Sequence, residues 1–139
     1  MKYVLDASIA VKWVLPEEDS SPALDLRDRV ESGMIEVVAP DTFLVEVAHA
    51  LTRAERRGLI LPGQALSGLN FVLSNEPRLH PYVPLLPRAV ELASRMRIGV
   101  YDCLYVALAE ELQCELLTAD ARLVKAFENT FRIVPLSSL

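Results

Sequence analysis

The sequence has 139 residues, of which 52% are hydrophobic and 24% charged, and its formal net charge at pH 7 is −5. This length fits one domain, expected to span residues 1–139, and the composition excludes a disordered or low-complexity chain. The charge does not favour a nucleic-acid partner, because phosphate is normally bound by a basic surface. The acidic excess can be reconciled with RNA binding if several carboxylates converge on bound cations, which invert the local field.

No pattern in the chain indicates export or membrane insertion. Asp6 and Lys12 interrupt the apolar start, and no stretch approaches the roughly 20 apolar residues that span a bilayer. The two cysteines, Cys103 and Cys114, match no metal-ligand spacing and are expected to be buried thiols. We therefore expect a cytoplasmic protein that has no membrane partner.

In the first half of the chain, short apolar runs alternate with segments of helical character. The predicted strands are 2–5 and 35–39, and a weaker candidate at 79–83 contains Pro81, which only a sheet edge would tolerate. The predicted helices are, in order, 7–14, a helix capped by Ser20 or Ser21 and ended by Gly33, a helix capped by Asp41 and ended near Gly58, and 63–73.

The second half continues the alternation. A helix is predicted over 87–97 with Gly99 as its stop, followed by a helix over 101–112 that is apolar almost all round and should therefore be buried. A core strand at 115–118, a short helix at 121–127 and a closing strand at 131–135 complete the chain. This alternation predicts an α/β fold in which helices cover both faces of a parallel sheet.

Two aspartates directly follow predicted strands. Asp6 follows the strand 2–5, and Asp120 follows the strand 115–118 with one residue between. Ligands of open parallel sheets bind at the carboxyl ends of the strands, so these carboxylates meet at one edge if both strands run the same way.

Two further acids lie on predicted helices. Asp102 stands at the start of the helix 101–112, where it is either a cap or a ligand. Glu46 lies away from the apolar stripe of its helix, on a ridge with His49 and Arg53, and could be part of a solvated face. Each of the four acids alone has such an ordinary structural interpretation. Gathered together, carboxylates repel unless a proton or a divalent cation neutralises them, and oxygen ligands favour Mg²⁺ or Mn²⁺.

Four segments of the sequence, taken in order, resemble the PIN domain, and within that superfamily the VapC-type toxins of VapBC toxin–antitoxin systems. They are Val4–Ser8 followed by Val11–Trp13, Ala39–Asp41 leading to Glu46–Ala48, Tyr101–Tyr105, and Leu117–Asp120. Each segment alone is a weak signal, whereas four in register are specific. The resemblance covers essentially the whole chain.

The resemblance implies a PIN-like three-layer α/β/α sandwich with a central, mainly parallel sheet of four to five strands. It implies that Asp6, Glu46, Asp102 and Asp120 form the family's acidic quartet, which holds Mg²⁺ or Mn²⁺ while a metal-activated water hydrolyses an RNA phosphodiester bond. Asp120 matches the least constant member of that quartet and could act through water.

Other residues and the partners follow from the same resemblance. Ser8 and Thr118 match small hydroxyl positions beside the acids. The implied partners are RNA as substrate, a second copy of the chain in a homodimer, and a small VapB-type antitoxin that covers the site. Operator DNA would be bound only indirectly, through the antitoxin.

Basic residues could contact the RNA as well. Arg53, Arg56 and Arg57 form the only dense basic cluster, which could steer phosphate or be a plain solvated helix end. Lys12 could touch substrate, whereas Trp13, between apolar neighbours, is expected to be packed.

On the residues alone, two other classes of protein are alternatives to a nuclease: a doubly wound phosphatase or phosphotransfer domain, and a non-catalytic interaction module. A phosphatase with an aspartyl nucleophile would need a second aspartate two residues after Asp6, where this chain has Ser8. A receiver-like domain would need paired acids in its first loop and a late lysine after a strand, and neither is evident. A PIN fold that serves only as an interaction module is the remaining alternative, although the presence of all four acids favours an enzyme.

Overall fold

The computed structural model describes residues 1–16 and 20–139. In this part of the chain, five strands form one sheet in the order β3-β2-β1-β4-β5, and all neighbouring strands are parallel. The strands are β1 (Lys2–Leu5), β2 (Glu36–Pro40), β3 (Arg78–His80), β4 (Glu115–Thr118) and β5 (Ile133–Pro135). The predicted α/β class with a parallel sheet of four to five strands is therefore confirmed.

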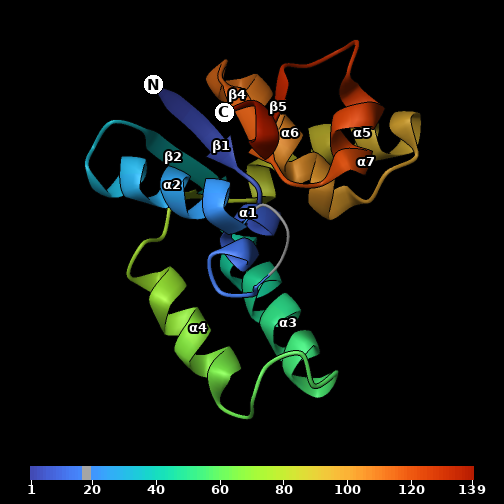
Figure 1. Ribbon diagram of the computed structural model, residues 1–139. Coiled ribbons are helices and arrows are strands. Elements are labelled where there is room, and N and C mark those ends of the chain that lie inside the picture. The colour runs from blue at the N-terminus through green and yellow to red at the C-terminus, as the bar shows by residue number, and fades with distance from the viewer. Residues whose placement is uncertain (17–19) are drawn as a thin grey trace.

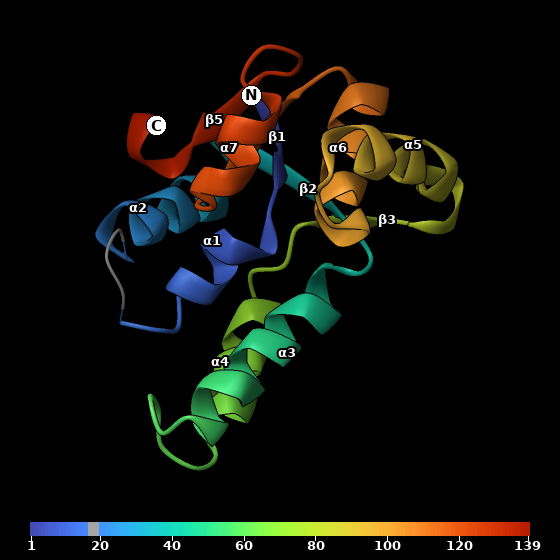
Figure 2. The ribbon, with the colours of Figure 1, turned by 90° about the vertical axis from the view of Figure 1, so that its right-hand side faces the viewer.

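Helices cover both faces of this sheet. Helices α5 (Leu86–Met96), α6 (Val100–Leu112) and α7 (Ala121–Phe127) lie on one face, and α1 (Ala7–Lys12) and α2 (Ser20–Glu31) lie on the other (Figures 1 and 2). Helices α3 (Phe43–Arg56) and α4 (Gln64–Leu73) pair as a hairpin that extends beyond the carboxyl ends of the strands. The short 3₁₀ helices Val83–Leu85 and Leu136–Ser138 complete the fold.

The predicted burial of the helix near residues 101–112 is confirmed. Residues 103–109 of α6 are all buried, because the helix packs on β1, β2 and β4 with one side and on α5 with another. Such a helix has no face left for solvent, which explains its nearly continuous apolar sequence.

The order of the strands places a switch point between β1 and β4. From β1 the chain moves outward through β2 to β3, and it then returns to the other side of β1 to add β4 and β5. Loops that leave the carboxyl ends of β1 and β4 therefore part in opposite directions and open a crevice, which is where doubly wound sheets bind ligands.

The predicted role of Asp41 as a helix cap is wrong. Helix α3 begins at Phe43 after Thr42, and neither residue 41 nor residue 42 makes a side-chain cap bond to it. Asp41 Oδ1 instead accepts a hydrogen bond of 3.0 Å from the backbone N–H of Tyr82. It thus ties the end of β2 to the segment after β3, a long-range partner that local sequence could not reveal.

Three other predicted boundaries shift. Ser20 is already helical, so neither it nor Ser21 is the cap of α2. Gly99 does not stop α5, because Arg97 does so in the left-handed conformation (φ 56°), and Gly99 is instead the residue that precedes α6. The weak strand predicted at 79–83 is β3, which ends before Pro81 and, as predicted, lies at a sheet edge.

No helix in the described ranges is long and apolar enough to cross a bilayer. Both cysteines are free thiols, with Cys103 buried as predicted and Cys114 only half-buried. The predicted packing of Trp13 is confirmed, since its side chain is buried and its Nε1 donates a 2.9 Å hydrogen bond to the carbonyl of Ala23.

Gly68 allows α4 to pack closely against Val14, which follows α1, and against Leu51 of α3. A Cβ added at Gly68 of α4 would lie 2.6 Å from Val14 Cγ1 and 3.4 Å from Leu51 Cδ1. We expect Gly68→Val to lower the free energy of unfolding by about 2–3 kcal/mol, because it overpacks this contact. Urea denaturation measures the change.

Ser67→Val is the matched control, because Ser67 is exposed on the same helix and pays only the helix-propensity cost of a β-branched residue. The double variant Gly68→Val/Val14→Ala should recover part of the loss. Equal destabilisation by the two single valine substitutions would contradict the packing argument.

Candidate active site

Asp6 lies directly after β1, at the switch point of the sheet. Its backbone N–H donates a 3.0 Å hydrogen bond to the carbonyl of Leu117 in β4, and its side chain is only 5% exposed. The hydroxyls of Ser8 and Thr118 each donate a 2.7 Å hydrogen bond to the same carboxylate oxygen, Oδ2. Oδ1 takes no part in this frame.

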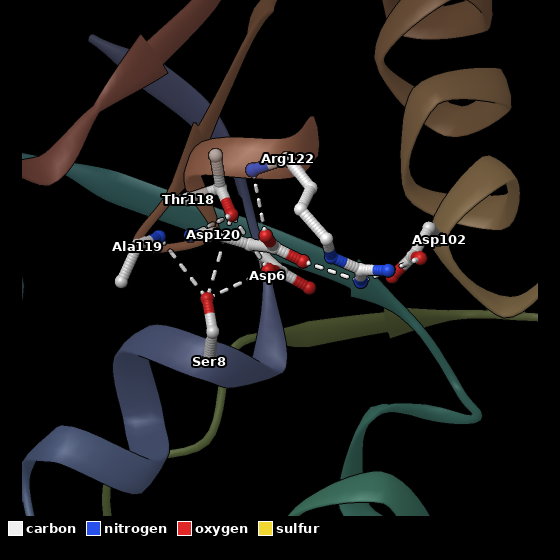
Figure 3. Close-up of polar contacts among 7 residues, drawn as sticks. All are labelled: Asp6, Ser8, Asp102, Thr118, Ala119, Asp120 and Arg122. Atoms are coloured by element: carbon white, nitrogen blue, oxygen red, sulfur yellow. Dashed lines mark hydrogen bonds and ion pairs between the residues drawn. The ribbon is translucent and has the colours of Figure 1, made fainter. Parts of the chain in front are cut away.

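The two hydroxyls are themselves held by backbone amides (Figure 3). Ser8 Oγ accepts a 3.1 Å hydrogen bond from the N–H of Ala119, and Thr118 Oγ1 accepts a 3.0 Å hydrogen bond from the N–H of Asp120. Because each hydroxyl accepts from an amide, its own proton is directed to Asp6. The local sequence at the end of β4 thereby fixes a carboxylate that belongs to the end of β1.

Glu46 reaches the same edge from α3. The hydroxyl of Tyr105, a fully buried residue of α6, donates a 3.0 Å hydrogen bond to Glu46 Oε2. The other oxygen, Oε1, is buried without a hydrogen-bond partner among the described residues. A buried carboxylate oxygen without a partner raises the free energy of the folded state, and a bound proton or cation at this atom would remove that penalty.

Asp102 and Asp120 complete the group of acids. Asp102 is the third residue of α6 and not its cap, while Asp120 does cap α7 by accepting a 2.9 Å hydrogen bond from the N–H of Arg122. The Arg122 guanidinium connects the two, since its Nη2 lies 3.0 Å from Asp120 Oδ2 and 3.7 Å from Asp102 Oδ2 (Figure 3).

The pKa values show that the acids form one electrostatic group. Burial raises the pKa of Asp6 to about 6, the Ser8 and Thr118 hydrogen bonds oppose the rise, and the charges of Asp102 and Asp120 add to it. Burial likewise raises the pKa of Asp102, with a further contribution from Asp120.

Glu46 has the largest shift of the group. Burial raises the pKa of Glu46 to about 8, the hydrogen bond from Tyr105 opposes the rise, and the charges of Asp6 and Asp102 add to it. Asp6, Glu46 and Asp102 thus each have a pKa raised in part by the charge of another acid of the group, although the four acids come from four different elements.

The group fits a hard cation in its donor chemistry. All four residues offer carboxylate oxygens, and the unpartnered Oε1 of Glu46 and the raised pKa values of Asp6 and Glu46 are features that a positive charge would relieve. In the described part of the chain, no three Asp, Glu, His or Cys side chains already surround one ion position. Side-chain adjustment would therefore precede shared coordination, which suits an ion such as Mg²⁺ that keeps several waters.

The other predicted contact residues lie on α3, close after it, and on α1. Arg53, Arg56 and Arg57 are exposed near the end of α3, and even Arg53 lies seven residues beyond Glu46, roughly 10 Å along the helix axis. Lys12 is half-buried at the end of α1. Contacts of these residues with RNA stay predictions.

Two residues of the site were missed by the sequence analysis. Tyr105 is a hydroxyl inside an otherwise apolar helix, three residues after Asp102, and this spacing places both on one side of α6. Arg122 follows Asp120 by two residues. The first position was a detectable signal, whereas the second is an ordinary surface arginine until the fold is known.

Comparison with known proteins identifies the family. The sequence matches the family model of the PIN domain over residues 3–128. It is 36% identical to Ribonuclease VapC3 of Pyrobaculum aerophilum over 91% of this chain and 95% of that protein. The chain belongs to the PIN-domain family, among proteins of VapC type. The predicted membership is confirmed.

Two further relatives agree with this membership. Ribonuclease VapC12 of Mycobacterium tuberculosis is 38% identical over 94% of this chain and 95% of its own length. The crystal structure of VapBC2 from Rickettsia felis, bound to a DNA fragment from its promoter, contains a chain that superposes with a TM-score of 0.65 at 18% identity, covering 97% of each chain. At that identity the superposition shows the PIN fold alone.

The raised pKa of Glu46 predicts how stability depends on pH. The folded chain binds this proton more tightly than the unfolded chain, whose glutamate has its ordinary pKa of 4.5, so stability falls as the pH rises from about 4.5 to about 8. Glu46→Gln removes this loss. We therefore expect the variant to be more stable than the natural protein at pH 8, on the order of 1–3 kcal/mol, with the difference shrinking toward pH 4.5.

Urea titrations at several pH values without added metal measure this difference. Glu111→Gln, an exposed substitution on α6, controls for the loss of one carboxylate. A Glu46→Gln variant whose stability relative to the natural protein does not change with pH would show that Glu46 is ionised without penalty.

Proposed function

We propose that this PIN-domain protein is a metal-dependent endoribonuclease, the toxin of a type II toxin–antitoxin system, which hydrolyses RNA phosphodiester bonds. The observation that supports the proposal best is the gathering of four carboxylates at the switch point of the sheet, including a buried glutamate oxygen that has no partner. The names of the ribonuclease relatives support the reaction.

The residues of the site would have two roles, holding the cation and orienting its ligands. Asp6, Glu46 and Asp102 would hold Mg²⁺ or Mn²⁺, and Asp120 would do so directly or through a water. Bound there, the cation would supply Lewis-acid activation of a water and charge neutralisation at the phosphate. Ser8 and Thr118 would keep the Asp6 carboxylate oriented, since both donate to its Oδ2.

The place of the acids beside the α3–α4 hairpin suggests a path for a polymeric substrate. They lie where the hairpin of α3 and α4 leaves the sheet, so a strand of RNA bound at the acids could continue along α3 toward Arg53, Arg56 and Arg57. Lys12, at the end of α1, is a further candidate for an RNA contact. Phosphate contacts of this kind would add affinity without sequence preference.

The proposed partners are a VapB-type antitoxin and a second copy of the chain. The solved VapBC2 structure from Rickettsia felis supports an antitoxin that also binds operator DNA, so that this chain would meet DNA only through it. We further propose that residues 1–139 form a single PIN domain. The cytoplasm is the proposed compartment, which the two free thiols support.

The central prediction concerns cleavage. The purified protein should cut single-stranded RNA with Mn²⁺ or Mg²⁺, EDTA should abolish cleavage, and Asp6→Asn should lower the rate by about 10²–10³-fold, because it removes an anionic ligand and keeps the size of the side chain. Cleavage is measured on an end-labelled oligonucleotide, with sequencing of RNA ends from expressing cells to identify the target.

Asp25→Asn, an exposed substitution on α2, is the matched control and should cleave as the natural protein does. Cleavage that persists in EDTA or in Asp6→Asn would contradict the proposed mechanism. Turnover of a small phosphoester without any RNA cleavage would favour a phosphatase, and binding of an antitoxin without any turnover would favour an interaction module.

The proposed homodimer predicts the mass in solution. Several large apolar side chains of the α3–α4 hairpin are more than 60% exposed, namely Val45 at the start of α3, Leu59 and Leu61 in the connecting loop, and Leu66 on α4. Light scattering coupled to size exclusion should give the mass of a dimer, because such surfaces tend to be covered. A monomer at high concentration would contradict this prediction.

A further inference from the structure

Arg122 is positioned at the acidic group in a way that neither the fold nor the cap of α7 requires. Its backbone N–H already serves the cap on Asp120, while its guanidinium reaches from α7 across to Asp102 on α6 (Figure 3). The side chain is 74% exposed. An ion pair this exposed contributes little to the stability of the fold. Stability therefore does not explain why the guanidinium lies between Asp102 and Asp120.

The contacts leave most of the guanidinium fork open. Both carboxylates are approached by the same atom, Nη2, and Nε and Nη1 make no bond to a described residue. Arginine binds a phosphate best with two parallel donors, and both such pairs, Nε with Nη2 and Nη1 with Nη2, include the atom that now contacts the carboxylates. An oxyanion therefore gains a bidentate contact when it replaces the carboxylates at Nη2.

The partners of Arg122 are also two of the proposed metal ligands. A divalent cation drawn to Asp102 and Asp120 competes with the guanidinium for the same oxygens, because one carboxylate oxygen cannot bond both at full strength. An RNA phosphate at the cation would then lie near the guanidinium, which Asp102 and Asp120 already hold beside the acids.

We propose that Arg122 is a phosphate-binding residue of the RNA site: Asp102 and Asp120 hold its guanidinium beside the acids, and an RNA phosphate replaces them as its partner when the cation binds. The inference rests on the proposed function and adds to it a residue for binding the substrate. It predicts two opposite effects of removing the guanidinium, tighter cation binding and weaker RNA binding.

The first experiment measures the cation alone. Mn²⁺ is titrated into the natural protein and into Arg122→Gln by isothermal calorimetry, and the variant should bind Mn²⁺ about 3- to 10-fold more tightly, because a competing positive charge is gone. Arg132→Gln is the matched control: this arginine is 84% exposed and faces Glu115 at the other end of β4, 3.8 Å away. It should bind Mn²⁺ as the natural protein does.

The second experiment measures RNA. With Mn²⁺ saturating, Arg122→Gln should raise the KM for a single-stranded oligonucleotide about tenfold, with a smaller change in kcat, and should flatten the dependence of log KM on log salt by about 0.7, the loss of one phosphate contact. Arg122→Lys should lie between the two, because it keeps the charge and loses the fork.

The outcomes separate this inference from the proposed function. If the natural protein cleaves RNA and Arg122→Gln has an unchanged KM and salt dependence, the assignment of Arg122 is overturned and the ribonuclease stands. If the natural protein binds neither Mn²⁺ nor RNA, the proposed function fails and the assignment fails with it. If Arg122→Gln fails to fold by circular dichroism, Arg122→Lys supplies the same KM and salt measurements.

Discussion

The site depends on a carboxylate buried where its charge is disfavoured. Asp6 directly follows β1 and is hydrogen-bonded to β4 at the switch point. Burial raises its pKa, although the hydroxyls of Ser8 and Thr118 favour its charged form. The backbone amides of Ala119 and Asp120 direct both hydroxyls. The pairing of β1 with β4 is thus what converts two distant sequence segments into one acidic group, and Glu46 and Asp102 add their charge from α3 and α6.

Much of this arrangement can be predicted from the sequence because its causes are local. The central strands β1, β2 and β4 carry apolar runs, since both faces of the sheet are covered there. An acid after such a strand must lie at the edge where parallel strands end. Asp6 and Asp120 follow that rule. The burial of α6 is equally visible in its composition, which leaves no polar face to turn toward water.

Other features could not be predicted, because they depend on contacts between distant segments. Asp41 precedes a helix in the manner of a cap, yet its carboxylate is used by Tyr82, and that partner becomes a neighbour only when β3 joins the sheet. Glu46 has the sequence environment of a solvated residue, and only the packing of α3 brings it to the hydroxyl of Tyr105. Arg122 gains its second carboxylate in the same way, from a helix that precedes it by a whole strand.

The order of the strands also governs when the site can exist. Asp102 lies on α6 and Asp120 follows β4, so two of the four acids come after β3 in the chain. A chain still emerging from the ribosome can form β1, β2 and β3 while Asp6 has neither the Thr118 hydroxyl nor the charges of Asp102 and Asp120 beside it. A nascent chain therefore cannot complete this acidic group before β4 and Asp120 have been synthesised.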